Sequence, residues 1–304
     1  MKNETSNNNI FWAAFKKRPA AFMARGAAVA VGLYSRRKFR DFAHRVVFGP
    51  KKYAIMRDSD ALRKIGYLVK DDRAGILIYP EKKGRGFQIC GPAENTLYTA
   101  ATVLGGEYDF EPSNPREKFI VIDIGLNIGC TSLYLADKKF VERVYSFEPF
   151  EPTLEHARNN MRLNPELAKK ICIFGFGLSD KDGATEITYN PDLPGAMSSV
   201  ADLFRGKGKP ERIHLKKAAD ILGPIFADHP DANVMLKIDC EGAEGEILRD
   251  IDAAGLLSRV GVIIMEWHNN VVKPLEELLA AHNFKIKVYG ANAKSGTGML
   301  KAWK

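Results

Sequence analysis

The sequence has no long apolar run and few cysteines. Its most apolar stretch, Pro19 to Tyr34, contains Arg25 and is followed by Arg36-Arg37-Lys38, which argues against a membrane-spanning helix. Arg25 also interrupts any secretory signal, and no cleavage site follows. The cysteines form no C-x-x-C pair and have no histidine spacing suited to zinc. We therefore expect a protein of a reducing, cytoplasmic compartment. The four cysteines are Cys90, Cys130, Cys172 and Cys240.

Acidic residues are scarce at the start of the chain. Residues 1–57 hold 13 Lys/Arg and 2 Asp/Glu, a net charge of +11, whereas the whole chain carries +8. The rest of the chain is therefore slightly acidic, which argues against a body that binds nucleic acid. The positive excess belongs to the N-terminal segment alone, and we expect no nucleic-acid partner.

Residues 11–48 combine that positive charge with apolar residues at helical spacing, from Phe11 to Val46. A basic amphipathic helix of this kind can lie on an anionic membrane surface. The alternative is a basic helix that packs on its own domain and keeps its charges in water. Both interpretations stay open, so peripheral contact with the inner face of a membrane is a hypothesis.

Three domains are predicted: a basic N-terminal segment at 1–51, a small pre-domain at 52–115 and a large domain at 116–304. The pre-domain contains short β-type runs at 65–69, 75–79 and 86–90, which predict an antiparallel meander. A helix is expected from Pro92, because proline is favoured at a helix start. We expect this pre-domain to cap a ligand cleft in the large domain.

From residue 119 onward strands and helices alternate, which predicts a doubly wound α/β fold with a mostly parallel, seven-stranded sheet. The last two strands are joined by the short stretch 290–296, too short for a crossover helix, so they should form an antiparallel edge hairpin. Residues 180–232 break the alternation, and two extra strands there with the loop 190–209 should lie over the cleft. Strands are expected at 119–124, 143–148, 171–176, 233–238, 260–266, 284–289 and 297–302, and helices near 130–139, 151–163, 243–250 and 272–282.

A glycine-containing turn follows the first strand of this domain, in Val121-Ile-Asp-Ile-Gly-Leu-Asn-Ile-Gly129. Glycines allow a tight turn and a close approach to a ligand, and nucleotide-like ligands bind beyond such strand ends. An acidic strand end at Asp123 would repel a pyrophosphate and suits a cofactor with a positive end. The hypothesis is S-adenosylmethionine, with its methionine end at Asp123, Gly125, Asn127 and Gly129.

The next two strand ends carry further candidates. Glu148 ends the second strand, where an acidic residue binds ribose hydroxyls in such folds. Ser179 and Asp180 follow the third strand and could bind the adenine edge, although Asp-Lys-Asp-Gly is also a strong turn signal. We assign Glu148 to the ribose and Ser179 with Asp180 to the adenine.

Acid–base candidates end the fourth and fifth strands. Asp239 and Glu241 lie two residues apart at a strand tip, and His268 ends the next strand. Histidine has a pKa close to neutral pH, so His268 could act as general base toward a hydroxyl. Asp239, Glu241 and His268 together would orient and deprotonate the acceptor, and which of the three is the base stays open. Lys237, inside an apolar strand, needs a partner of opposite charge. Glu244 is expected only to favour a helix start.

These motifs together resemble the FkbM-type family of S-adenosylmethionine-dependent methyltransferases over residues 119–290. The resemblance implies O-methylation of a hydroxyl on a sugar, glycan or secondary metabolite, with no metal required. Leu126 departs from the small residue usual in the family and could narrow the loop's approach to the methionine. The resemblance rests on 121–129, Phe147-Glu148-Pro149, 159–164, Leu178-Ser179-Asp180, 237–244 and Glu266-Trp267-His268.

Two other functions compete with this one. An NAD(P)-dependent oxidoreductase would need a G-x-G-x-x-G loop, and the chain has G-x-N-x-G instead. A non-catalytic module that binds S-adenosylmethionine would not need the carboxylates and the histidine. A metal-assisted variant is also compatible with the sequence, because Asp239, Glu241 and His268 are acceptable ligands.

Overall fold

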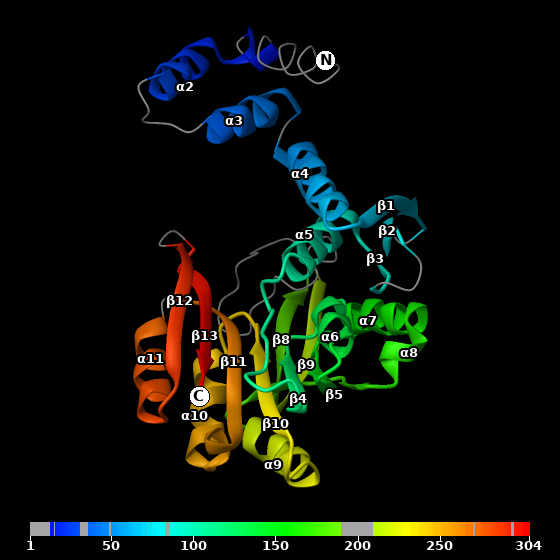
Figure 1. The fold of residues 1–304 in the computed structure, drawn as a ribbon, viewed down its shortest axis with the longest axis vertical. Helices are drawn as coiled ribbons and strands as arrows, with labels where there is room; N and C mark the ends of the chain where they lie inside the picture. The colour runs from blue at the N-terminus through cyan, green and yellow to red at the C-terminus, as the bar shows by residue number, and fades with distance from the viewer. Residues whose placement is uncertain are drawn as a thin grey trace. The chain divides into compact units, whose positions relative to one another are not determined.

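The protein is described from a computed structural model, which defines residues 13–14, 16–30, 36–48, 50–73, 75–82, 86–189, 209–269, 271–292 and 295–304. The chain divides into two compact units, Met1–Lys64 and Ile65–Lys304 (Figure 1). Helix α4 (Pro50–Lys64) runs through the domain boundary predicted at residue 51. The division of the chain into three domains stays a prediction.

The N-terminal unit contains three described helices, α2 (Pro19–Ala30), α3 (Arg36–Phe48) and α4. The rings of Phe22 and Phe39 lie 4.7 Å apart between centroids, and the guanidinium of Arg25 lies 4.2 Å from the ring centroid of Phe42. Apolar side chains of α2 and α3 therefore pack on each other. Among the described residues, no helix is both long and apolar enough to cross a membrane.

The second unit begins with a small antiparallel sheet, as predicted for the pre-domain. Its strands are β1 (Tyr67–Asp72), β2 (Gly75–Pro80) and β3 (Ile89–Gly91), in that order. Helix α5 (Ala93–Leu104) starts after Pro92, the predicted helix start. Residue 74 and residues 83–85 lie outside the described residues.

The core of the second unit is a seven-stranded sheet in the order β12-β13-β11-β10-β4-β5-β6, which confirms the predicted fold class. Pairs from β11 through β6 are parallel, and β12 and β13 are antiparallel to their neighbours, so the edge hairpin is also confirmed. The strands are β4 (Phe119–Ile124), β5 (Val141–Phe147), β6 (Ile171–Phe174), β10 (Asn233–Ile238), β11 (Val260–Trp267), β12 (Lys285–Asn292) and β13 (Thr297–Trp303).

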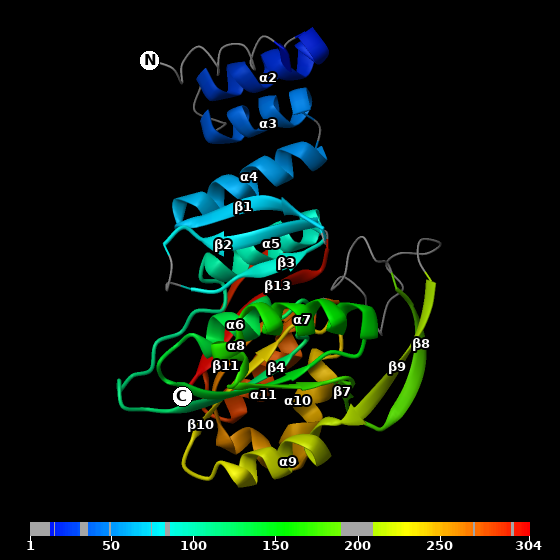
Figure 2. The same ribbon diagram turned by 90° about the vertical axis from the view of Figure 1, so that its right-hand side faces the viewer.

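Helices cover both faces of this sheet, as a parallel sheet requires. Figure 2 shows α6, α7 and α8 on one face and α9 and α10 on the other. Ile120, Ile122 and Ile124 of β4 face the second group, in one cluster with Leu222 of α9 and Ile247 of α10. The helices are α6 (Cys130–Ala136), α7 (Glu151–Leu163), α8 (Pro165–Ala168), α9 (Ala218–Asp228), α10 (Glu244–Ala253), the 3₁₀ turn η1 (Leu256–Arg259) and α11 (Val272–Ala281).

The structure corrects the sequence-based elements between 171 and 232. The third strand ends at Phe174 rather than at 176, because the chain leaves the sheet and forms β7 (Gly177–Ser179) beside β9 (Lys209–Lys217). Helix α9 was missed, because Gly223-Pro224 within it is a strong breaker signal. The predicted extra strands are present as β8 (Gly183–Tyr189) and β9, while residues 190–208 of the predicted loop lie outside the described residues.

Two asparagines, Asn160 of α7 and Asn164 directly after it, bond the pre-domain to the large domain. The side-chain oxygen of Asn160 accepts the backbone N–H of Cys90 at 2.7 Å, and its amide donates to the Cys90 carbonyl at 3.1 Å. Asn164 makes the same pair of bonds to Gln88, at 2.8 and 2.7 Å. The two amides thus satisfy backbone groups that a neighbouring strand would otherwise bond.

Candidate active site

The turn between β4 and α6 depends on its glycines. Gly125 has a φ of +91°, and a β-carbon there would overlap the carbonyl oxygen of Asp239. Gly129 has a φ of +85° and caps α6, and a β-carbon there would lie 2.7 Å from Cε of Met161. Asn127 also adopts a left-handed conformation, with a φ of 53°. The loop therefore passes within contact distance of the tip of β10.

Leu126 is explained by packing. It is buried and forms a cluster with Leu154 and Ala157 of α7, with Ile173 of β6 packed beside it. Its side chain therefore anchors the loop to the helix behind it. This packing does not support the prediction that Leu126 narrows the loop's approach to the methionine end of the cofactor.

Glu148 stands at the centre of the loop's hydrogen bonds. Its Oε2 accepts the backbone N–H of Asn127 at 2.9 Å, and its Oε1 accepts that of Phe150 at 3.1 Å. Burial raises the pKa of Glu148 to about 7, against the lowering effect of these two bonds. The carboxylate can therefore change its charge near neutral pH.

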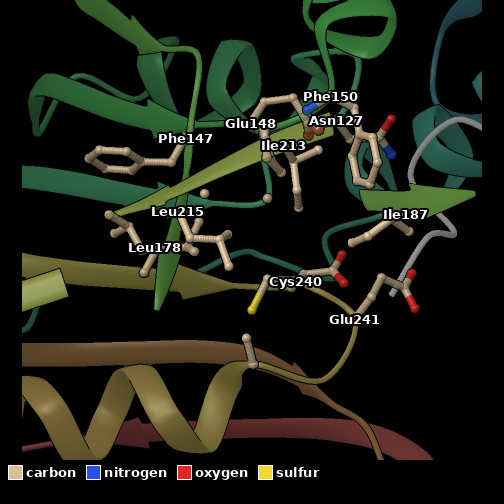
Figure 3. Close-up of a pocket in the computed structure, with 16 residues that line it drawn as sticks. Asn127, Phe147, Glu148, Phe150, Leu178, Ile187, Ile213, Leu215, Cys240 and Glu241 are labelled. Atoms are coloured by element: carbon tan, nitrogen blue, oxygen red, sulfur yellow. Dashed lines mark hydrogen bonds between the residues drawn. The ribbon is translucent and has the colours of Figure 1, made fainter. Parts of the chain in front are cut away.

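A cavity of about 670 Å³, part of it open to solvent, lies beyond the tips of β4, β5 and β10. Figure 3 shows Glu148 and Asn127 on one side of it and Cys240 and Glu241 on the other. Strands β8 and β9 line it as well, so the two strands of the predicted insertion border the cleft, while residues 190–208 between them lie outside the described residues. The lining residues are Ile124, Gly125, Asn127, Phe147, Glu148, Pro149, Phe150, Gly177, Leu178, Ile187, Ile213, Leu215, Asp239, Cys240, Glu241 and Ala243.

Ser179 and Asp180 do not line this cavity. Ser179 is buried and its hydroxyl donates to Oδ1 of Asp180 at 3.3 Å, while Asp180 is exposed. Gly177 and Leu178, just before them in β7, line the cavity instead. Ser179 and Asp180 lie outside the cavity wall because β6 ends early and β7 turns away from the sheet, and their assignment to the adenine stays a prediction.

Asp123 is likewise outside the cavity and fully buried. Its Oδ2 accepts the hydroxyl of Ser132 at 2.5 Å, and its Oδ1 lies 3.1 Å from Nζ of Lys237. Lys237 also donates to the carbonyl oxygen of Gly125 at 2.6 Å. Asp123 thus holds the lysine that fixes the glycine turn, and Lys237 has the partner that the sequence required.

Tyr108 ties the pre-domain side of the unit to this ion pair. Its hydroxyl donates to Oδ2 of Asp239 at 3.0 Å, and Nζ of Lys237 lies 5.5 Å from its ring centroid. Nζ of Lys237 is also 4.0 Å from Oδ2 of Asp239. Burial, and then the charge of Asp239, raises the pKa of Tyr108 well above its usual range, so it stays a donor. These contacts fix the carboxylate of Asp239.

His268 is held between two glutamates. Its Nδ1 lies 2.8 Å from Oε1 of Glu244, and its Nε2 lies 3.4 Å from Oε2 of Glu241. Burial lowers the pKa of His268, but the hydrogen bond and charge of Glu244 outweigh it and raise the value to about 9. Burial and the neighbouring Asp239 raise the pKa of Glu241 to about 8. His268 is therefore protonated at neutral pH, which opposes its predicted role as the free base.

A second cavity, of about 1050 Å³ and partly open to solvent, lies between α5 and the strand tips. It shares Gly125, Asn127, Asp239 and Glu241 with the first cavity. The two cavities therefore meet at the paired carboxylates. Its lining residues are Asn95, Tyr98, Thr99, Thr102, Val103, Tyr108, Gly125, Leu126, Asn127, Cys130, Thr131, Lys237, Asp239, Glu241 and Glu266.

A metal ion could be held near this junction. Asp239, Glu266 and His268 each offer one ligand atom, and these atoms lie within 4.8 Å of one another. An ion there would have to compete with Glu241 for Nε2 of His268 and with Tyr108 for Asp239. Asp239 and His268 thus already have partners, Tyr108 for the first and Glu244 and Glu241 for the second.

The first cavity has the donor set that S-adenosylmethionine needs. Among its described lining residues none is basic, so a pyrophosphate would find no counter-ion there. Glu148 offers a carboxylate to ribose hydroxyls, and Phe147, Leu178 and Leu215 offer apolar surface to a purine. Asp239 and Glu241 add acidic side chains to the cavity wall, which suit a cofactor with a positive sulfur. These residues fit the predicted cofactor and disfavour a dinucleotide.

Sequence reasoning missed several residues of the site. Tyr108 lies in a segment without any motif, and only the fold brings it to Asp239. Glu244 begins α10, as expected, and it is also fully buried, bonded to His268 and accepting the backbone N–H of Gly242 at 3.0 Å. The polar face of α5 could have been found, because Asn95, Thr99 and Thr102 recur at helical spacing.

Comparison with known proteins agrees with this geometry. Residues 123–286 match the family described as the methyltransferase FkbM domain. Methyltransferase sdnD of Sordaria araneosa is 30% identical over 200 residues, which cover 58% of this chain and 75% of that protein. Methyltransferase 1 of Beauveria bassiana is 29% identical over 161 residues, 48% of this chain and 62% of that protein.

Among solved structures, the methyltransferase FkbM from Methylobacillus flagellatus KT is 16% identical, with a TM-score of 0.44, and the match covers 94% of this chain and 71% of that one. The family match spans more than half of the chain and includes both strand-tip motifs around Asp123 and Asp239. The chain belongs to the FkbM methyltransferase family and is an S-adenosylmethionine-dependent methyltransferase.

Proposed function

We propose that the protein moves the methyl group of S-adenosylmethionine to a hydroxyl oxygen of a sugar, glycan or secondary metabolite. The observation that carries this proposal is the junction of the two cavities at Asp239 and Glu241. One cavity has the donors for the cofactor, the other is large enough for a small-molecule acceptor, and carboxylates lie where they meet.

The residues of the first cavity divide among the parts of the cofactor. Gly125, Asn127 and Gly129 shape the backbone around the methionine end, and Asp123 acts there through Lys237 rather than by contact. Glu148 binds the ribose. The adenine lies against Phe147 and Leu178, with Ser179 and Asp180 behind the cavity wall.

Proton removal falls to the residues at the junction. Bound S-adenosylmethionine supplies a methyl group that its positive sulfur already activates, so the protein's tasks are alignment and deprotonation. Glu241 lines both cavities and takes the proton of the acceptor hydroxyl as the new C–O bond forms. His268 orients Glu241 and is itself oriented by Glu244, while Asp239, fixed by Tyr108, orients the acceptor. His268 is thus a positioning residue.

Transfer of labelled methyl tests the proposal. The full chain is incubated with methyl-labelled S-adenosylmethionine and fractionated metabolite and glycan pools, with and without chelator, and the linkage of the label is determined. Ether-linked label supports O-methylation. Label on nitrogen or carbon would overturn it, and a protein that binds the cofactor but labels no fraction would support a non-catalytic module. Loss of label only in the incubations that contain chelator would support the metal-assisted variant.

Peripheral membrane contact through residues 11–48 stays a separate proposal, supported by the positive charge of that segment. The contact of Phe22 with Phe39 supports the alternative, in which the apolar side chains pack within the unit. Sedimentation of the full chain and of a chain without residues 1–48 with anionic vesicles distinguishes them. Equal binding of both chains would contradict membrane contact.

A further inference from the structure

Helix α5 presents a polar face to the second cavity. Asn95, Tyr98, Thr99 and Thr102 are spaced three and four residues apart, so they share one side of the helix. Leu97, Ala100 and Val103 are each at most 1% exposed, which anchors the helix in the core. The cavity wall is therefore built from amide and hydroxyl groups on a rigid helix.

The opposite wall is acidic. Asp239, Glu241 and Glu266 line it, and Lys237 is the only basic side chain among the described residues of the cavity. Lys237 is 2% exposed, paired with Asp123 and bonded to the carbonyl oxygen of Gly125. Its charge therefore holds the glycine turn in place and is not offered to an acceptor. A phosphate or carboxylate on an acceptor would meet three acidic side chains in a partly dehydrated site, and the described lining offers no cation that is not already paired.

We propose that the second cavity selects a polyhydroxylated acceptor that carries no negative charge, a neutral sugar or an amino sugar. Hydroxyl groups of such an acceptor donate to the carboxylates on one side and exchange hydrogen bonds with Thr99 and Thr102 on the other. The ring of Tyr98, 60% exposed, offers an aromatic surface to a sugar ring. This inference rests on the proposed O-methylation. It adds the charge of the acceptor and names α5 as the helix that contacts the acceptor.

The first experiment compares four acceptor pools under equal conditions: neutral oligosaccharides, amino sugars, sugar phosphates and uronic acids. The full chain and methyl-labelled S-adenosylmethionine are used, and label and linkage are measured. We expect ether-linked label in the neutral or amino pools, at least about tenfold above the two acidic pools, as one uncompensated charge contact predicts. Ether-linked label mainly in sugar phosphates or uronic acids would overturn the inference and leave O-methylation intact.

Other results separate the two proposals. Label on nitrogen or carbon would overturn O-methylation, whichever pool carried it. Cofactor binding without label in any of the four pools would contradict the assigned acceptor class. Neutral and amino sugars share the hydroxyl chemistry, and the ratio of label between those two pools tells which of them the cavity prefers.

A charge placed on α5 provides the second test. Thr102→Lys adds a cation to the cavity wall, and Ala184→Lys adds the same charge at an exposed position of β8 that lines neither cavity. We expect Thr102→Lys to reduce labelling of uncharged acceptors about tenfold and to raise the relative labelling of sugar phosphates, with S-adenosylmethionine affinity unchanged by calorimetry. The same acceptor profile in Thr102→Lys, Ala184→Lys and the wild type would contradict the role of α5.

Discussion

Nζ of Lys237 lies 3.1 Å from Oδ1 of Asp123, and both side chains are at most 2% exposed. This ion pair joins adjacent strands, because β4 and β10 pair in parallel with Asp123 opposite Lys237. The same ammonium donates to the carbonyl oxygen of Gly125 and lies beside Asp239. One buried charge pair thus connects the glycine turn of the cofactor cavity to the carboxylate at the junction.

Removing the lysine should therefore destabilise the protein strongly. Lys237→Met leaves the carboxylate of Asp123 buried without its cation, which costs about 3–5 kcal/mol of unfolding free energy. Urea denaturation of the wild type, Lys237→Met and the exposed control Lys285→Met measures the difference. The double variant Asp123→Asn/Lys237→Met should recover part of the loss. A midpoint for Lys237→Met equal to that of the control would refute the role of the pair.

The turn at Gly125 should tolerate no side chain. Gly125→Ala combines a left-handed backbone with overlap of the Asp239 carbonyl, whereas Gly255→Ala has a similar φ of +73° and no atom within 4 Å of its new β-carbon. The control should lose about 1–2 kcal/mol from the backbone alone. Gly125→Ala should lose clearly more and also bind S-adenosylmethionine more weakly, by calorimetry. Equal losses in both variants would show that the close approach to Asp239 is absent.

Cofactor affinity should rise with pH through about 7. Burial raises the pKa of Glu148 to about 7, and its ionised form is the better acceptor for ribose hydroxyls, so binding should tighten as pH increases past that value. Glu148→Gln should bind about 10- to 100-fold more weakly above pH 7, as expected for a hydrogen bond to a charged group. It should also lose this pH dependence, while ionisations of the cofactor itself persist in both proteins. Identical affinities in both proteins would overturn the ribose assignment.

The sequence predicted the parts of the fold that depend on local pattern. The apolar run before Gly125, the alternation after residue 119 and the short link before β13 specify the parallel sheet and its antiparallel edge. Glu148, Asp239 and Glu241 line the first cavity, as expected for strand ends next to the glycine turn, which have a fixed place in such sheets. Their roles in binding and catalysis stay predictions.

The sequence could not predict contacts made by the fold between distant segments. Tyr108 reaches Asp239 across 131 positions, and no motif marks it. Ser179 and Asp180 lie away from the cavity because β6 ends early and β7 pairs with β9. Strand β9 belongs to the insertion, and the local sequence pattern does not fix where that insertion lies. The environment of His268 was hidden as well, since its charge depends on Glu244 and Glu241 approaching from another element.

Turnover should require ionised Glu241. Burial and Asp239 raise the pKa of Glu241 to about 8, so kcat/KM should increase with pH until that carboxyl has lost its proton. Glu241→Gln should lower kcat about 10²- to 10⁴-fold, the usual contribution of a general base. Labelled-methyl rates on the fraction that the wild type labels, measured across pH, provide the check. Full activity in Glu241→Gln would remove Glu241 from the mechanism.

His268 should influence the pH profile of kcat/KM through its effect on Glu241. With a pKa of about 9, His268 is positively charged at neutral pH, and its charge lowers the pKa of the neighbouring Glu241. His268→Gln removes that charge, so the Glu241 carboxyl should hold its proton to higher pH and the rising limb of kcat/KM should move upward. A variant His268→Gln with lower activity but an unmoved limb would assign His268 a structural role only.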